Sequence, residues 1–293
     1  MANAHTANTV RMAAAWRTAA LAVALCALLL LPSSALAAPP TLVSVPSDTA
    51  SSGGVHSSLP LLPNVTVVPD LAGKGRNGYV GVFTHAAPYF SVQANTENCT
   101  GLSKVSDQAA AHNCRYATNA GPFSSLIKGG CIGAVISQGH TAASDFASTH
   151  TMFGLTASGD WLLGNVGSAS QAKELGVTEL VTGFNWLVYN SSITVAQAGG
   201  ELAPRTAVGV DTMGRLLIVE VDGCEKCPSG KGFTMKQIAE FMVSPKVNAV
   251  HAINLDGGGS STFYANGKVI DYPTCFDIPY KCERKVANIL CVA

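Results

Sequence analysis

Short apolar segments separated by turn residues dominate the chain from residue 78 onward. Runs of this kind predict β-strands over 79–83, 89–92, 152–155, 161–163, 180–182, 186–189, 206–210, 216–221, 247–255, 262–264 and 268–270. Three of the connecting segments carry the Gly, Asp and Asn residues of hairpin turns, at 156–160, 211–214 and 265–267. The pattern therefore predicts a strand-rich domain.

Helical periodicity is confined to short stretches. Residues 107–113 predict one short helix. Thr234 and Gln237 have the spacing of a capping box, apolar residues follow on one helical face, and Pro245 ends the second helix. Many strands and few helices, without regular alternation, predict an α+β fold with a mixed, largely antiparallel sheet and a few packed helices.

The N-terminal part divides into two segments. Residues 1–37 resemble a signal peptide, because Arg11 and Arg17 precede an apolar run and Ala35-Leu36-Ala37 is a cleavage pattern. The alternative is an N-terminal anchor helix. Residues 38–77, rich in Pro, Ser and Gly, predict a linker, and 78–293 the folded domain. No later segment reaches the roughly 20 apolar residues of a membrane span, so we expect a soluble protein outside the cell or in the secretory lumen (Golgi or lysosome).

Charge is scarce and balanced. The chain has 18 basic and 18 acidic residues, only 12% of the total. No basic run is available to follow a phosphate backbone, which argues against nucleic-acid binding. Surface polarity must then come from neutral residues and glycans, and three glycosylation sequons begin at Asn64, Asn98 and Asn190.

Cysteine usage suggests an oxidising compartment. Eight Cys follow the predicted signal peptide, at 99, 114, 131, 224, 227, 275, 282 and 291. An even number predicts a disulfide framework, whose connectivity the spacing alone leaves open. The alternatives are a zinc site on Cys224, Cys227, Cys275 and Cys282, and a redox motif at Cys224.

The strongest chemical signal is Asp256 followed by Gly257, Gly258 and Gly259. A carboxylate at a strand end is placed to act as an acid, base or nucleophile, and Gly-rich backbone can offer its N–H groups to an anion. A plain hairpin turn explains the same residues equally well.

Two further segments place polar residues among apolar ones. Arg205 precedes an apolar strand, and its guanidinium is suited to bidentate phosphate binding. Asn185 and Trp186 together suit a sugar, by hydrogen bonding and by ring stacking. A surface salt bridge for Arg205 and core packing for Trp186 are the alternatives.

Several segments together resemble the phosphodiester glycosidase family. Residues 254–263 are similar to its NLDGGGS-x-TF signature, and 205–209 to its RTAIG segment. Gly183 with Trp186-Leu187 resembles its SG-x-x-WL segment, and 152–159 its FGI…DG hairpin. The family's NGGFF turn appears here as residues 119–123, with Ala120 and Pro122 as departures.

The resemblance implies a disulfide pairing: Cys99–Cys131, Cys114–Cys291 and Cys275–Cys282, which leaves Cys224–Cys227.

The resemblance also implies hydrolysis of a glycosyl-1-phosphodiester, which releases a sugar such as N-acetylglucosamine. The expected binding partner is a glycan or small molecule that carries this phosphodiester. Asp256 is then the nucleophile or base, and Arg205 with Gly257, Gly258 and Gly259 binds phosphate. The remaining implied contacts to sugar or phosphate come from Asn119, Asn185, Thr206, Ser260, Ser261 and Thr262. No cofactor is required, and Ca²⁺ is neither identified nor excluded.

Two other functions remain open at the level of sequence. The domain can be a non-catalytic carbohydrate-binding module that uses Asn185 and Trp186. It can also be a serine hydrolase using Ser260 or Ser261 with His251, although no Gly-x-Ser-x-Gly elbow is present.

Overall fold

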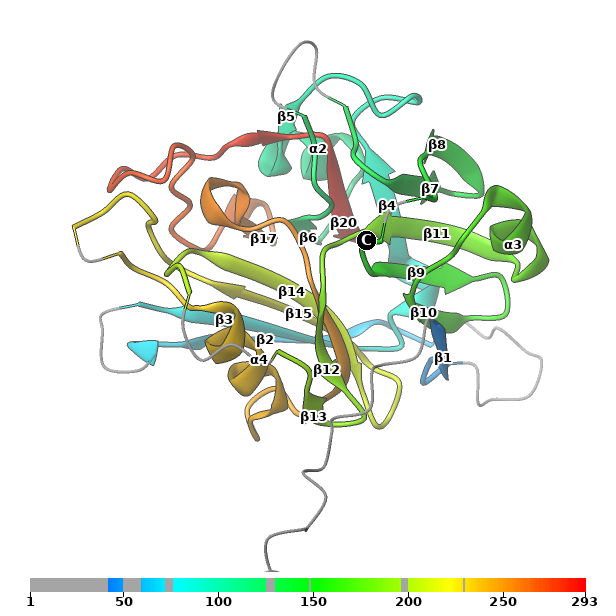
Figure 1. Cartoon of the computed structure of the whole chain (residues 1–293), viewed down its shortest axis with the longest axis horizontal. Helices are drawn as coiled ribbons and strands as arrows, with labels where there is room; N and C mark the ends of the chain where they lie inside the picture. The colour runs from blue at the N-terminus through cyan, green and yellow to red at the C-terminus, as the bar shows by residue number, and fades with distance from the viewer. Residues whose placement is uncertain are drawn as a thin grey trace, which may run out of the picture. The chain divides into compact units, whose positions relative to one another are not determined.

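Antiparallel sheets make up most of the structure (Figure 1). This computed structural model describes residues 42–49, 59–71, 76–124, 130–147, 149–195, 200–228 and 230–293. These residues all belong to one compact unit of the chain, Pro39–Ala293. The predicted signal peptide, 1–37, lies outside the described residues.

The largest sheet in the described part of the chain has seven strands, in the order β13-β12-β16-β14-β15-β3-β2. In chain order they are Leu62–Val68 (β2), Gly78–Thr84 (β3), Trp186–Tyr189 (β12), Ser192–Ile193 (β13), Arg205–Asp211 (β14), Leu216–Val221 (β15) and Ala249–Asn254 (β16).

Helix α4 (Met235–Val243) packs on one face of this sheet. The predicted capping box is present, with the Thr234 side chain accepting from Gln237 N and the Gln237 side chain accepting from Thr234 N. In β15, side chains alternate between the two faces: Leu217 packs toward α4, whereas Leu216 packs in the central core. Burial on both faces explains why β15 reads as a continuous apolar run.

A second sheet has six strands within the described residues, in the order β1-β10-β9-β11-β7-β8. They are Leu42–Pro46 (β1), Ala134–Ser137 (β7), His140–Ser144 (β8), Met152–Thr156 (β9), Asp160–Gly164 (β10) and Val177–Thr182 (β11). The sequence pattern did not predict helix α3 (Ala169–Glu174), which begins with Ser168 as its N-cap and contacts β11.

A third sheet has the order β18-β17-β6-β20-β4 in the described part, and a two-stranded ribbon pairs β19 with β5. Helix α2 (Val105–Ala111) packs on β6, β17 and β20 and starts two residues before its predicted range. The strands are Phe90–Ala94 (β4), Ser103–Lys104 (β5), Tyr116–Asn119 (β6), Phe263–Ala265 (β17), Lys268–Val269 (β18), Lys285–Val286 (β19) and Asn288–Val292 (β20).

The central core lies between these three sheets. Trp161 from β10 is fully buried there, with its ring against Phe90 and Phe153 and its Nε1 donating to Gly214 O at 2.9 Å. Side chains from all three sheets contribute to the same cluster. A single shared core therefore fixes the three sheets relative to one another, and with them the strand ends that carry the site.

The segment 38–77 is not only a linker. Its residues 42–46 and 62–68 are strands β1 and β2, each at the edge of a sheet, paired with β10 and β3. Edge strands tolerate Pro, because one row of their backbone groups needs no partner. This is why a Pro-rich composition concealed them.

The predicted α+β class is confirmed, and every pair of named strands in the described residues is antiparallel. Among those residues, no helix has the length and apolar character needed to cross a bilayer.

Candidate functional site

Asp256 lies just beyond the C-terminal end of β16, where the central core meets the surface. Two backbone hydrogen bonds fix this strand end: Leu255 N donates to Thr206 O, and Asp256 N donates to Ala120 O, both at 2.9 Å. The next residues form a short 3-10 turn, Gly258–Ser260. Asp256 is thus held by β14 on one side and by the turn after β6 on the other.

The side chain of Asn119 connects these segments by hydrogen bonds. Its Nδ2 donates to Asp256 O at 2.7 Å, and its Oδ1 accepts from Thr262 N at 3.1 Å. Thr206 Oγ1 lies 3.1 Å from both Asn119 Oδ1 and Ser261 Oγ. Four of these residues are fully buried and support the turn from behind: Asn119, Thr206, Ser261 and Thr262. Their expected contacts to sugar or phosphate stay a prediction.

Two of the three glycine N–H groups already have partners within the protein. Gly258 N donates to Pro204 O at 2.9 Å, and Gly257 N faces the Asp256 carboxylate. Gly258 has a φ of +58°, and a Cβ there would lie 2.9 Å from Glu225 Oε1. A Cβ on Gly259 would clash with Arg284 Nη2. The glycines therefore allow charged side chains to approach the turn closely.

Those charged side chains, Glu225, Asp277 and Arg284, were not predicted from the sequence. Glu225 lies inside the Cys224–Cys227 ring, and Asp277 lies inside the Cys275–Cys282 ring. The two rings are joined by the bond from Lys226 N to Asp277 O, 2.9 Å long. The available signal was two charged residues within each short Cys-to-Cys spacing, in a sequence otherwise poor in charge.

Arg284 links the rings to the turn after Asp256. Its Nη2 forms an ion pair with Asp277 Oδ2 at 2.8 Å, and its Nε donates to Cys275 O at 2.7 Å. Its Nη1 lies 3.4 Å from Ser260 Oγ, and Ser260 in turn hydrogen-bonds the Asp256 side chain. Ser260 is fully buried.

Asp256 and Arg284 border two cavities. The smaller, about 360 Å³, is also lined by Asn185, Arg205 and Glu225. The larger, about 710 Å³, has basic side chains on its wall together with Phe123; these are Lys104, Arg284 and Lys285. Lys104 and Lys285 face each other across the β5–β19 ribbon. Glu283 also lines the larger cavity, and the smaller one carries both Arg205 and Glu225. Asp256 therefore borders two cavities of mixed charge, of which the larger has more basic side chains.

Burial controls the proton affinity of the site. Desolvation raises the pKa of Asp256 to about 6, against the opposing effects of the Ser260 hydrogen bond and the Arg284 charge. Desolvation also raises the pKa of Glu225, and the Asp277 charge adds to this increase. Two carboxyl groups with raised pKa values in one cavity are typical of an acid–base site.

Arg205 reaches the smaller cavity but is already engaged by the backbone. Its Nε donates to Phe233 O at 2.9 Å and its Nη2 donates to Glu201 O at 2.8 Å. These two bonds use two of the five N–H donors of the guanidinium, so the bidentate phosphate contact expected from the sequence would have to come from the other three. Arg205 therefore supplies positive charge to the wall, and Arg284 is the more central cation.

The residues of the two alternative functions are separated. Asn185 is exposed and lines the smaller cavity, whereas Trp186 packs on Tyr189 and His251. His251 also packs on Tyr189. No hydrogen bond in the described residues joins His251 to Ser260 or Ser261. The structure thus supports neither the paired use of Asn185 and Trp186 nor a Ser–His dyad.

The four implied disulfides are all present. They are Cys99–Cys131, Cys114–Cys291, Cys224–Cys227 and Cys275–Cys282. The four sulfurs of the alternative zinc site thus form two disulfides and are not available as thiolate ligands. The three sequon residues, Asn64, Asn98 and Asn190, are exposed, which leaves them accessible to modification but does not test it.

Comparisons with known proteins agree with this geometry. The family model for phosphodiester glycosidase matches residues 112–293. N-acetylglucosamine-1-phosphodiester alpha-N-acetylglucosaminidase from Homo sapiens is 31% identical over 208 residues, which cover 64% of this chain and 39% of the human protein. The mouse enzyme of the same name is 32% identical, with the same coverage. This chain thus spans well under half the length of these curated relatives.

Solved structures give the same result. The catalytic domain of the zebrafish enzyme, auto-inhibited by its pro-peptide, superposes with a TM-score of 0.70 and 26% identity, covering 86% of this chain and 88% of that one. A hypothetical protein from Synechocystis, 14% identical with a TM-score of 0.55, shares the fold; the match covers 79% of this chain and 62% of that one. From its sequence and its structure alike, the chain belongs to the phosphodiester glycosidase family.

Proposed function

We propose that this protein hydrolyses a glycosyl-1-phosphodiester, releasing the sugar and a phosphomonoester. The observation that carries the proposal is the position of Asp256, a carboxylate with a raised pKa that borders two cavities together with Arg284. The names of the relatives specify N-acetylglucosamine-1-phosphodiester, so we propose N-acetylglucosamine or a similar sugar.

The two cavities suggest how the substrate is divided. The smaller one offers Asn185 and Glu225, which suit the hydroxyl and amide groups of a sugar. The larger one has Lys104 and Lys285 on its wall, which suit a phosphate and the group attached to it. Arg284, which borders both, would lie beside the phosphate oxygen that departs from the anomeric carbon.

The chemistry of the leaving group explains the demands on the site. A phosphomonoester has a second pKa of about 6, so it departs with little protonation. The usual strong general acid of glycosidases is then less necessary, and stabilisation of negative charge becomes the main requirement. Arg284 and Arg205 supply that charge.

Asp256 can act in two ways in this scheme. As nucleophile, a carboxylate oxygen bonds to the anomeric carbon while the bond from that carbon to the phosphate oxygen breaks, its electron pair leaving with the phosphate. Water then cleaves the glycosyl ester. As base, Asp256 removes a proton from a water whose oxygen bonds to the anomeric carbon, while the bond from that carbon to the phosphate oxygen breaks and its electron pair leaves with the phosphate. Both require the ionised form of Asp256.

We also propose the secretory lumen (Golgi or lysosome) or the extracellular space as the place of action. Four disulfides are typical of an oxidising compartment. Expression with the N-terminal 37 residues intact, followed by N-terminal sequencing of the secreted protein and glycosidase treatment, tests the leader and the glycans at Asn64, Asn98 and Asn190.

The decisive experiment screens the protein against a panel of sugar-1-phosphodiesters and then measures variants on the best substrate. Asp256→Asn should lower kcat about 10³-fold or more, and Arg284→Ala about 10²-fold. Arg205→Ala should have a smaller effect. The control is Glu240→Gln, an exposed position on α4, which should turn over like the wild type.

Two results would contradict the proposal. Near wild-type turnover by both Asp256→Asn and Arg284→Ala would show that these two residues do not carry the reaction. Sugar binding measured by calorimetry, with no turnover of any phosphodiester, would instead identify a carbohydrate-binding module.

A further inference from the structure

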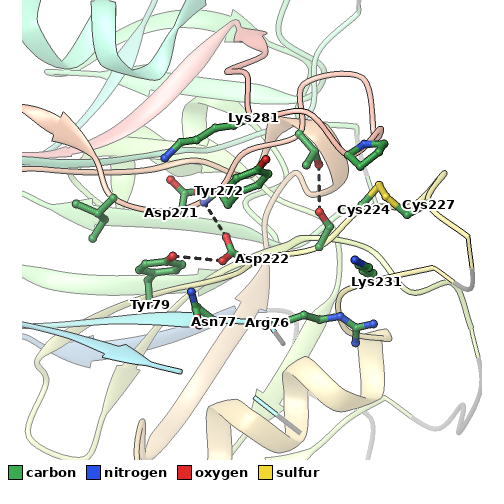
Figure 2. Close-up of a pocket in the computed structure, with 14 residues that line it drawn as sticks. Arg76, Asn77, Tyr79, Asp222, Cys224, Cys227, Lys231, Asp271, Tyr272 and Lys281 are labelled. Carbon is green, nitrogen blue, oxygen red and sulfur yellow. Dashed lines mark hydrogen bonds between the residues drawn. A yellow bond between two sulfur atoms is a disulfide. The ribbon is translucent and has the colours of Figure 1, made fainter. Parts of the chain in front are cut away.

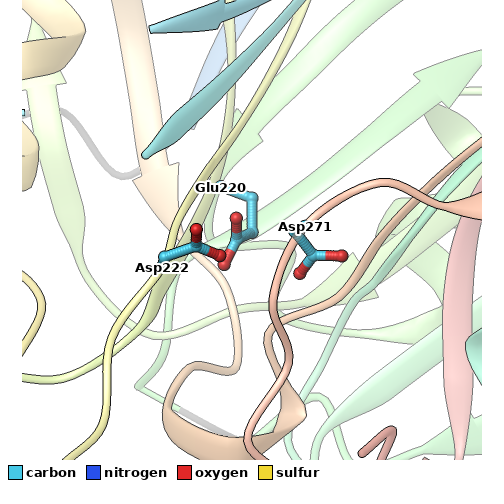
Figure 3. A group of neighbouring side chains, drawn as sticks. All are labelled: Glu220, Asp222 and Asp271. Atoms are coloured by element: carbon cyan, nitrogen blue, oxygen red, sulfur yellow. The ribbon is translucent and has the colours of Figure 1, made fainter. Parts of the chain in front are cut away.

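Three carboxylates lie together away from the residues assigned to the reaction, and two of them, Asp222 and Asp271, line another cavity. Glu220, Asp222 and Asp271 each contribute an oxygen, and these oxygens all lie within 4.8 Å of one another (Figure 3). Glu220 on β15 and Asp222, the second residue after it, point to the same side because strand side chains alternate. Asp271 follows β18, so the cluster joins the seven-stranded sheet to the C-terminal segment.

Two members of the cluster are buried without compensation. Glu220 and Asp271 are each only 1% exposed. Glu220 Oε2 has no hydrogen-bond partner, and the only N–H from another residue that faces the Asp271 carboxylate, among the described residues, is that of Phe263, outside good hydrogen-bond geometry. Burial and mutual repulsion raise the pKa of both groups well above the usual range, although the N–H of Phe263 opposes this for Asp271. Buried carboxylates in this state need either a proton or a cation.

The neighbours of the cluster do not neutralise it. Asp222 Oδ2 accepts from Tyr79 OH at 3.2 Å and its Oδ1 accepts from Tyr272 N at 2.8 Å. Lys281 lines the same cavity, about 460 Å³, and its charge lowers the pKa of Asp222 and Asp271 in part (Figure 2). None of the three carboxylates forms an ion pair in the described part of the chain.

We propose that Glu220, Asp222 and Asp271 bind a Ca²⁺ ion. All the available ligands are oxygens, which suits a hard cation and not zinc or copper. Two oxygens that share one Ca²⁺ at about 2.4 Å can be at most about 4.8 Å apart, which matches the observed limit. The cavity beside Asp222 and Asp271 gives water access to complete the six to eight ligands that Ca²⁺ prefers.

The ion would strengthen a connection that supports the catalytic residues. Asp222 is followed by the ring that carries Glu225, and Asp271 is followed by the segment that carries Asp277 and Arg284. The two segments already touch, because Thr274 Oγ1 donates to Gly223 O at 3.2 Å. A cation bound by both Asp222 and Asp271 would fix the two segments to each other at the residues where they begin. This structural role does not depend on the reaction proposed above.

The test measures thermal unfolding of chelator-treated protein at pH 7 as CaCl₂ is added. Ligand at about 100 times its Kd should raise the Tm of the wild type by about 5–10 °C. The double variant Glu220→Gln/Asp271→Asn should show no Ca²⁺-dependent rise. Glu179→Gln, which changes a buried carboxylate elsewhere, is the matched control and should respond like the wild type.

Terbium luminescence gives a second measurement that needs no disruptive variant. Tyr79 hydrogen-bonds Asp222, so Tb³⁺ in this site should emit on tyrosine excitation, and Ca²⁺ should displace it with a stoichiometry of one. Tyr79→Phe should reduce the emission at least about two-fold while it leaves the Ca²⁺-dependent Tm rise in place.

Two outcomes overturn the proposal. One is a wild-type Tm that does not respond to Ca²⁺, with a double variant more stable than the wild type, which would show that the carboxyl groups hold protons. The other is a Ca²⁺ response of equal size in the wild type and in the double variant, which would place the ion elsewhere.

Discussion

The side-chain amide of Asn119 donates a 2.7 Å hydrogen bond to the main-chain carbonyl of Asp256. The two residues are 137 positions apart in the sequence. Asn119 is the last residue of β6 in the third sheet, whereas Asp256 follows β16 of the seven-stranded sheet. The same side chain accepts from Thr262 N. Asn119 therefore sets the path of the chain both before and after the glycine turn.

Two replacements of Asn119 should distinguish its contribution to stability from its role in positioning Asp256. Asn119→Ala leaves buried polar groups without partners and should cost about 2–4 kcal/mol in urea unfolding. The near-isosteric Asn119→Asp loses the donor to Asp256 O, and it should lower kcat about 10-fold or more with little change in KM, because Asp256 is displaced. Asn185→Ala, at an exposed position on the same cavity, should change KM and leave stability unaltered. Equal kcat values for wild type and Asn119→Asp would contradict the positioning role.

The rate should depend on pH through Asp256. Because its ionised form is the reactive one and its pKa is about 6, kcat/KM should rise as pH increases through about 6 and level off above it. Rates measured from pH 4 to 8 on a phosphodiester, whose own charge does not change in that range, provide the check. A profile that is flat between pH 5 and 7 would show that Asp256 does not titrate in the free enzyme.

Gly258 should tolerate no side chain. Its φ is +58°, and an added Cβ would lie 2.9 Å from Glu225 Oε1 and 3.1 Å from Asp277 Oδ1. Gly258→Ala should cost about 2 kcal/mol or more and should lower turnover, because both carboxylates must move. Gly139→Ala is the matched control, since Gly139 also has a positive φ, +79°, but open space around it. It should cost about 1 kcal/mol, the backbone strain alone, with full activity. Identical losses in the two variants would argue against the crowding.

Glu179 should make the protein less stable as pH rises. It is buried between sheets, accepts from Val92 N and Gln138 N, and has a pKa raised by desolvation to about 7. The folded state therefore binds the proton more tightly than the unfolded state. Its contribution should be fully present below about pH 4.5 and be lost as pH rises through about 7, on the order of 3 kcal/mol in total. Urea unfolding of wild type and Glu179→Gln from pH 4 to 8 should show a smaller decline in the variant. Parallel curves would assign the decline to other groups.

Local sequence determined the elements whose signals are contained within a few residues. The capping box at Thr234, the hairpin turn before Trp161 and the strand that precedes Asp256 all follow from propensity and spacing, and the structure confirms them. The resemblance to a family supplied the disulfide pairing, which spacing alone left open. Edge strands β1 and β2 escaped prediction, because half of their backbone faces no partner and Pro is tolerated there.

Tertiary structure decided which residues form the site. Asp256 is recognisable in the sequence, but Arg284 and Glu225 reach it only because two disulfide rings pack together beside a turn without side chains. Burial is equally non-local: Asn119 is fully buried and hydrogen-bonds the Asp256 main chain, a contact that its sequence neighbours do not reveal. Glu220 and Asp271 meet for the same reason, since only the packing of β15 against the C-terminal segment puts two distant carboxylates in one place. Local patterns encode secondary structure, whereas electrostatic environment depends on contacts between residues that are far apart in the sequence.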